Sequence, residues 1–138
     1  MAITFKFYSD AALTTLVTVP LTFSQSTPSP TANDKVVYLG SVASGKTAEA
    51  ASDPGVDPIL VSIIDAASGS GSPATDVKLA ATSGGLATAT AGAPLNIGTQ
   101  ILSGSANAVE IHIRVLDSTG IVATNTDLSL ETNYLVEA

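Results

Sequence analysis

The chain has 138 residues, 45% of them hydrophobic and 12% charged, which is enough for one domain with its own core. Twelve acidic against five basic residues give a net charge of −7, which disfavours nucleic acid and anionic membranes as partners because both are bound through Lys and Arg. The chain contains no cysteine, so disulfides and thiol-based sites are excluded, and it shows neither a secretory signal nor a membrane-length apolar run. We therefore expect a soluble protein made in the cytoplasm.

Two strands are predicted in the N-terminal region. In the first, Ile3–Tyr8, hydrophobic and polar residues alternate, as they do in a half-buried strand. Its hydrophobic face would consist of Ile3, Phe5 and Phe7. The second spans Leu16–Phe23, where Pro20 indicates an edge or a bend.

A proline-containing loop over Gln25–Asn33 leads to a strand over Lys35–Gly40. A stretch rich in Ser, Gly and Ala follows and, with Asp53-Pro54-Gly55, predicts a turn region. Asp53 and Asp57 bracket this turn, so their carboxylates suit either an ordinary turn or a cation site. The turn is the preferred interpretation, because Asp before Pro-Gly is a common turn sequence.

The most hydrophobic segment is Pro58–Asp65, which has apolar residues on both faces of the expected strand. These residues are Ile59, Leu60, Val61, Ile63 and Ile64. One interpretation is a central strand that is buried on both sides. The other is that one of its faces meets a neighbouring subunit.

The next region combines flexible and regular segments. A Gly- and Ser-rich connection over Ala66–Ala74 precedes a strand over Asp76–Ala81. The segment Thr82–Pro94 permits no prediction, whereas Leu95–Leu102 is a strand candidate.

The clearest strand pattern lies at Ala108–Asp117. Apolar residues occupy one face: Val109, Ile111, Ile113 and Val115. The other face carries Glu110, His112 and Arg114. The single histidine is therefore expected to belong to a solvated polar row, and we expect it to form neither a zinc site nor a hydrolytic triad.

The C-terminal part contains a turn and one strand. Asp117-Ser118-Thr119-Gly120 has typical turn residues at its first and fourth positions. The last strand spans Asp127–Val136. Its inward face is expected to carry Leu128, Leu130, Tyr134 and Val136, opposite Ser129, Glu131 and Asn133.

Together these segments predict seven or eight short strands without an amphipathic helix between them. This pattern indicates an all-β fold, and we expect a single antiparallel β-sandwich over residues 1–138. Parallel sheets are disfavoured because their strands need long crossover connections, usually helical.

Several turn-and-strand phrases resemble small virion proteins of tailed bacteriophages. They are Phe7–Thr15, Val36–Ser41, Val61–Asp65, Ala93–Gly98 and Val115–Gly120. The resemblance implies an immunoglobulin-like sandwich that decorates the capsid exterior as a cement protein and stabilises the shell. It also implies the major capsid protein as a partner, together with other copies of this chain in a homo-oligomer, for which a trimer is one option.

Two other functions compete with capsid decoration. A tail- or fibre-associated sandwich that attaches to host-surface glycans is the alternative, although the chain has only six aromatic residues and no Trp. An enzyme is disfavoured, and no cofactor or metal is expected, because the sequence shows no catalytic constellation. The residues expected to contact a partner are Ile3, Phe5, Phe7, Ile59, Leu60, Val61, Ile63 and Ile64.

Overall fold

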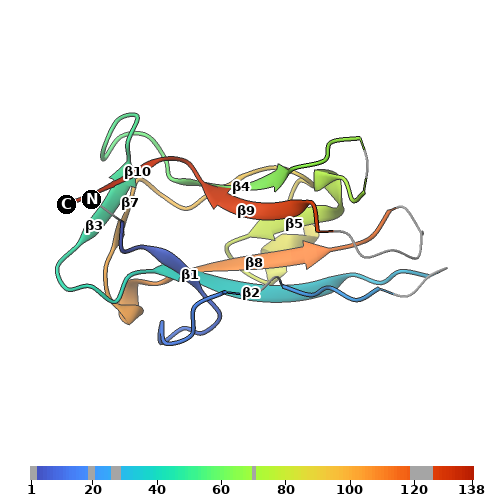
Figure 1. The fold of residues 1–138 in the computed structure, drawn as a ribbon, viewed down its shortest axis with the longest axis horizontal. Coiled ribbons are helices and arrows are strands. Elements are labelled where there is room, and N and C mark those ends of the chain that lie inside the picture. Colours follow the sequence, from blue (N-terminus) through green and yellow to red (C-terminus); the bar gives the residue numbers. More distant parts are fainter. Residues whose placement is uncertain (1–2, 19–20, 26–28, 70, 119–125) are drawn as a thin grey trace.

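The computed structural model describes residues 3–18, 21–25, 29–69, 71–118 and 126–138 (Figure 1). Within these ranges the chain forms ten short strands and three 3₁₀ helices. The strands are β1 (Lys6–Tyr8), β2 (Asn33–Gly40), β3 (Thr47–Ala50), β4 (Leu60–Asp65), β5 (Val77–Ala80), β6 (Leu95–Asn96), β7 (Gln100–Leu102), β8 (Val109–Val115), β9 (Leu128–Thr132) and β10 (Leu135–Glu137). The 3₁₀ helices are η1 (Ala74–Asp76), η2 (Gly84–Ala87) and η3 (Ser105–Asn107). In the part of the chain that the structure describes, no helix has the length and hydrophobicity to cross a membrane.

All paired strands are antiparallel and form three sheets. The largest has the order β1-β2-β8-β5, and its longest pairing joins β2 to β8 from Asn33↔Val115 to Leu39↔Val109. The two smaller sheets have the orders β10-β3-β7 and β6-β4-β9. The prediction of an all-β fold with antiparallel sheets is therefore confirmed.

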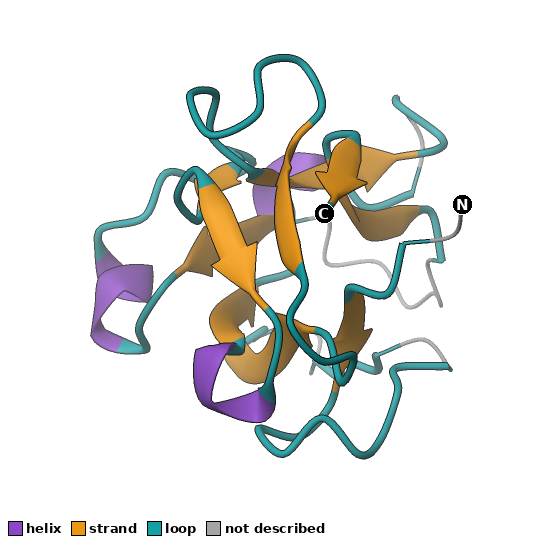
Figure 2. Ribbon diagram, turned by 90° about the vertical axis from the view of Figure 1, so that its left-hand side faces the viewer, coloured by secondary structure: helices purple, strands orange, loops and turns teal. Residues whose placement is uncertain are grey.

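The two smaller sheets follow one another in a single layer. β3 is the middle strand of one small sheet and β4 is the middle strand of the other. On one side of them β9 leads into β10, and on the other side β6 leads into β7, so the two sheets form the two halves of one layer. Hydrogen bonds continue the pairing between the halves, from the Ile59 amide to the Gly98 carbonyl and from the Ala51 amide to the Tyr134 carbonyl. This layer faces the four-stranded sheet, and the end-on view shows the strands around a common interior (Figure 2).

Both layers contribute to the hydrophobic core. The four-stranded sheet supplies Val37, Leu39, Val77, Leu79, Ile111 and Ile113, and the other layer supplies Ala48, Ile59, Val61 and Ile101. The N-terminal segment adds Phe5. The alternation predicted for β8 is confirmed, because Ile111 and Ile113 are buried whereas Glu110 lies on the exposed face.

The prediction of a strand over Leu16–Phe23 is wrong for the residues described there. Leu16 forms only an isolated bridge with Tyr8, and residues 19–20 lie outside the described part. Leu21 and Phe23 still pack against the core from irregular backbone, and the Lys35 ammonium lies 5.4 Å from the centre of the Phe23 ring. Leu21 and Phe23 thus pack against the core, although their backbone does not pair as a strand.

Strand β3 was missed by the sequence analysis, which expected a turn region there. Its inward residues, Ala48 and Ala50, are completely buried but small, so they produce little hydrophobic contrast with their neighbours. The predicted strand Leu95–Leu102 is divided near Gly98, where φ is +102°. A positive φ is easily adopted only by glycine and interrupts an extended strand.

The immunoglobulin-like topology is not confirmed. For this comparison, β3–β4, β6–β7 and β9–β10 are each counted as one interrupted strand, and the strands are numbered along the chain. The four-stranded sheet β1-β2-β8-β5 then has the order one, two, six, four. The corresponding sheet of an immunoglobulin constant domain combines strands one, two, five and four. The predicted turn Asp117–Gly120 lies partly outside the described residues.

Candidate interaction surface

The junction between β9 and β10 is held by the side chain of Asn133. Its Oδ1 accepts a hydrogen bond from the Leu60 amide at 3.0 Å, and its Nδ2 donates one to the Pro58 carbonyl at 3.1 Å. The Asn133 amide also donates to the Leu60 carbonyl at 3.2 Å. One residue thus makes several bonds to the start of β4, so β10 does not continue the alternation of β9.

This junction turns Tyr134 to the outside. Tyr134 is 90% exposed and Val136 is 43% exposed, whereas Leu135 between them packs against the core. The prediction that Tyr134 and Val136 face inward is therefore wrong. The prediction for Leu128 and Leu130 is confirmed, because both pack against the core.

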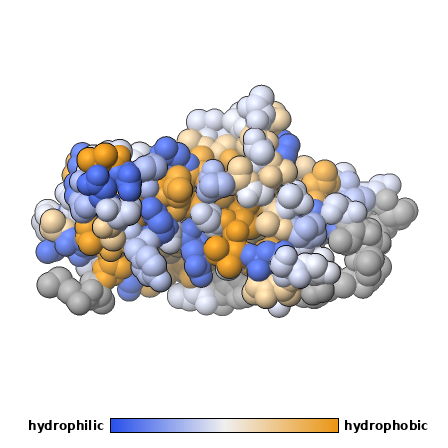
Figure 3. Space-filling model, turned by 90° about the horizontal axis from the view of Figure 1, so that it is seen from above, coloured by the Kyte–Doolittle hydropathy of each residue, from blue (hydrophilic) through white to orange (hydrophobic). Residues whose placement is uncertain are grey.

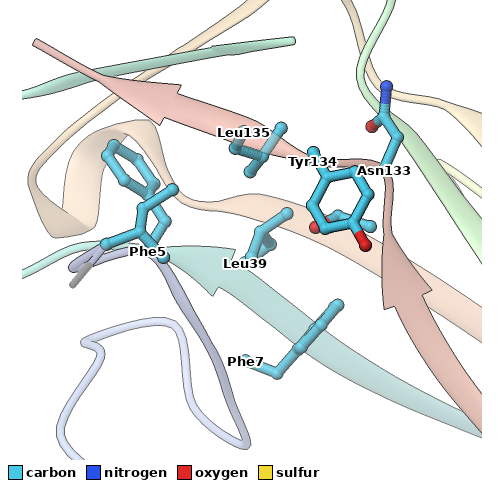
Figure 4. A pocket seen from close by; sticks show the side chains of 8 residues that line it. Phe5, Phe7, Leu39, Asn133, Tyr134 and Leu135 are labelled. Carbon is cyan, nitrogen blue, oxygen red and sulfur yellow. The ribbon is translucent and has the colours of Figure 1, made fainter. Parts of the chain in front are cut away.

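Tyr134 stands beside two shallow hollows. One, of about 260 Å³, lies between the N-terminal segment and β10 and is lined by Ile3, Phe5, Phe7, Leu39, Thr132, Asn133, Tyr134 and Leu135. In the close-up, Phe5, Phe7, Leu39 and Leu135 surround this hollow, and Tyr134 lies at its rim (Figure 4). The other, of about 360 Å³, is lined by Ala51, Ser52, Asn133 and Tyr134. Both lie near or below the lower end of the range of about 300–1,000 Å³ for small-molecule pockets, so they suit an inserted side chain or a single small group.

The outer face of the β10-β3-β7 sheet adds to this exposed surface. Because Ala48 and Ala50 point inward, Glu49 between them points outward. Glu49 is paired with Val136 on one side and Gln100 on the other, and Leu102 on β7 is 47% exposed. We call Tyr134, Val136 and Leu102 together the Tyr134 face.

The residues expected to contact a partner are distributed between the core and the surface. Phe5, Ile59 and Val61 are buried in the core, so their side chains are packed within this chain. Those that pack partly buried against the core are Ile3, Phe7 and Ile63. Leu60 and Ile64 lie on the outer face of β4, where Ile64 is 37% exposed.

The outer face of β4 is less hydrophobic than its sequence suggests. Glu131 pairs with Ser62, and Ser129 pairs with Ile64, so polar side chains adjoin the exposed part of β4. The interpretation of β4 as a central strand agrees with its position between β6 and β9. The expectation that both of its sides are buried is wrong, because Ile64 on the outer face is 37% exposed. On the face of the molecule seen from above, polar side chains divide the hydrophobic surface into separate patches (Figure 3).

The polar row on β8 is held by contacts between polar side chains, one of which is an ion pair. His112 Nε2 lies 3.1 Å from Glu110 Oε2, and the guanidinium of Arg114 donates to both carboxylate oxygens of Asp34, at 2.8 and 2.9 Å. The hydrogen bonds from Arg114 hold the pKa of the Asp34 carboxyl below its ordinary value. The row lies opposite the core face, as predicted.

The segment Asp53–Asp57 forms an ordinary turn. The amides of Val56 and Asp57 both donate to the Asp53 carbonyl, and Ser52 Oγ donates to Asp57 Oδ2 at 2.6 Å. Among the described residues no group of three or more His, Asp or Glu side chains could hold a metal ion. The preferred interpretation as a turn is confirmed.

Comparison with protein-family models, with curated proteins and with solved structures finds no match for this chain. The Tyr134 face was missed by the sequence analysis, which placed both Tyr134 and Val136 in the core. The polar Asn133 in a regular alternation is the only sequence signal at this position, and it does not reveal a change of phase. The surface that the structure offers is thus an exposed aromatic residue beside shallow hollows, on a sheet face that also carries Val136, Leu102 and the charged Glu49.

Proposed function

We propose that this chain is a non-enzymatic structural protein of a tailed-phage virion that binds the outer capsid surface and stabilises the shell. Its partners are then the major capsid protein and other copies of itself. The phage assignment rests on the resemblance of the sequence phrases described above. The observation that carries the binding role is the Tyr134 face.

An exposed tyrosine beside hollows is a suitable anchor for a protein–protein contact. Tyrosine supplies a large contact area with few rotatable bonds, and aromatic residues are enriched among those that dominate binding energy. Tyr134 is 90% exposed, so a partner could bury nearly the whole side chain. The adjacent apolar hollow of about 260 Å³ could receive a side chain in return.

The divided hydrophobic surface on the face shown in Figure 3 also suits a protein that acts in many copies. Each separate patch supports only a modest contact, so one copy would bind weakly. Copies that also contact one another on a symmetric shell would bind far more tightly together than singly. The net charge of −7 would limit unspecific attachment to DNA.

The test measures binding to expanded tailed-phage capsids that lack decoration protein. The wild-type chain should bind saturably and raise the temperature at which the shells disrupt. Tyr134→Ser should weaken binding about thirtyfold or more, the effect of losing a residue that contributes about 2 kcal/mol. Failure of the wild-type chain to bind any such shell would refute the decoration role.

A matched pair of leucines provides the control. Leu102 and Leu116 are exposed to nearly the same extent, 47% and 46%, but only Leu102 belongs to the Tyr134 face. Leu102→Ser should reduce binding and Leu116→Ser should not. Equal losses in both variants would show that the Tyr134 face is not the contact surface.

Attachment to host glycans from a tail or fibre is the second candidate, and the exposure of Tyr134 also favours it. An exposed aromatic ring can stack on the C–H face of a sugar, and the hydroxyl-bearing residues Ser52 and Thr132 line the neighbouring hollows. Saturable binding on a glycan array, lost in Tyr134→Ser, combined with no binding to capsids, would support this function instead.

A further inference from the structure

The N-terminal segment Ile3–Tyr8 crosses from one layer of the fold to the other. Its last three residues, Lys6–Tyr8, form β1 and pair with β2 at the edge of the four-stranded sheet. Before them, the Thr4 amide donates a hydrogen bond to Glu137 Oε1 on β10 in the opposite layer, at 2.8 Å. The segment therefore covers one open side between the layers.

A small polar cluster holds the beginning of this segment. The Thr4 hydroxyl donates to the same Glu137 oxygen that accepts the Thr4 amide. Thr4 Oγ1 also lies 2.6 Å from Oγ of the buried Ser41, whose Oγ accepts the Ala43 amide at 3.1 Å. One carboxylate oxygen thus receives two hydrogen bonds from the segment.

The surroundings of Glu137 favour its ionised form. The hydrogen bond from the Thr4 hydroxyl is the main cause that lowers the pKa of Glu137 below its ordinary value of 4.5. The hydrogen bond from the Thr4 amide and the charge of Lys46 also lower this pKa, whereas partial burial raises it. Lys46 immediately precedes β3, and the β3 residue opposite Glu137 is the uncharged Ala48. The charge of Lys46 thus acts together with the hydrogen bonds from Thr4 to favour the carboxylate of Glu137.

The segment also covers hydrophobic surface. Phe5 is buried in the core, and Phe7 lines the hollow of about 260 Å³ together with Leu39 and Leu135 (Figure 4). Displacing the segment would remove Phe5 and Phe7 and expose Leu39 and Leu135 to solvent. Opening would thus change the surface of the protein substantially.

We propose that Ile3–Tyr8 is an acid-released strap, which the ionised carboxylate of Glu137 holds across the open side of the fold. Hydrogen bonds to a charged acceptor are about twice as strong as those to a neutral one, so protonation of Glu137 weakens both contacts with Thr4 at once. Because the pKa of Glu137 is lowered in the folded chain, its carboxylate stabilises the folded arrangement at pH values above its ordinary pKa of 4.5. This stabilisation is lost as the pH falls through the folded-state pKa. This inference goes beyond the proposed function, because it concerns a conformational change of the chain itself.

The test is hydrogen exchange measured by mass spectrometry at about pH 7 and about pH 3, corrected for the intrinsic pH dependence of exchange. In the wild-type chain, protection of Ile3–Tyr8 should fall about threefold or more at the lower pH, while β2 and β8 stay protected. Glu137→Gln keeps a neutral acceptor, so its strap should be weakly protected at both pH values. The control Glu131→Gln changes an exposed carboxylate on β9 and should retain the wild-type response.

Three results would overturn the proposal. They are unchanged protection of the wild-type strap at low pH, a pH response in Glu137→Gln equal to that of the wild-type chain, and loss of strap protection only together with β2 and β8. The last would show that the segment unfolds with the rest of the domain and is not a separate strap.

Discussion

Replacing Asn133 by alanine tests how the β9–β10 junction is held. The substitution removes the bonds of the side chain to the Leu60 amide and the Pro58 carbonyl, at 3.0 and 3.1 Å. Each such bond contributes about 1 kcal/mol net, and partly buried backbone groups that lose their partner add to the penalty. We therefore expect Asn133→Ala to lower the free energy of unfolding by about 2–3 kcal/mol.

The assay is urea unfolding at 25 °C, followed by far-ultraviolet circular dichroism. The midpoint should fall while the dependence on urea stays unchanged, since the area exposed on unfolding is the same. In a thermal scan, 2–3 kcal/mol corresponds to about 6–12 °C for a chain of this size.

Asn96→Ala provides the matched control. Within the described part of the chain, Asn96 Oδ1 accepts only the local bond from the Gly98 amide at 2.9 Å. This bond is exposed, so its loss should reduce stability by about 1 kcal/mol or less. If Asn133→Ala is no more destabilising than Asn96→Ala, the backbone alone holds the junction, and our explanation for the outward position of Tyr134 is wrong.

Two further predictions concern the core and the N-terminal turn. Ile59 is completely buried, so Ile59→Ala should reduce stability by about 2–5 kcal/mol in the same assay; Ile64→Ala, on the outer face of β4, should cost clearly less, and equal losses would contradict the assigned orientation of β4. The Asp10 carboxylate accepts bonds from the Thr14 hydroxyl and from the amides of Thr14 and Thr15, with the hydroxyl as the main cause of its lowered pKa. The ionised Asp10 carboxylate therefore stabilises the turn at pH values above its ordinary pKa of 3.8, and this effect is lost as the pH falls through the folded-state pKa. Amide exchange of Thr14 and Thr15, measured by NMR, should rise in acid in the wild-type chain but stay independent of this titration in Asp10→Asn; identical responses would argue against the role of Asp10.

The sequence by itself determined the fold class and the strands with strong hydrophobic contrast. β8 carries large apolar residues at alternate positions, and a period of two matches the geometry of a strand regardless of its neighbours. β4 is instead a short, nearly continuous apolar run, which is typical of a central strand. The inward positions of Ile111 and Ile113 could therefore be predicted before any partner strand was known. The lack of helical periodicity similarly established an all-β fold.

Only the tertiary structure decided the position of β3 and the interruption between β9 and β10. Ala48 and Ala50 are completely buried because neighbouring strands pack closely around them, and small side chains carry little hydrophobic signal of their own. Asn133 bonds to β4, which lies far away in the sequence, and this contact changes the phase of alternation so that Tyr134 points outward.

The exposed surface and the N-terminal strap depend on such distant contacts as well. Thr4 and Glu137 stand 133 positions apart, and only the folded chain brings the hydroxyl of one to the carboxylate of the other. Local periodicity reports which side chains avoid water, whereas contacts between distant residues decide where a strand ends and which face it presents.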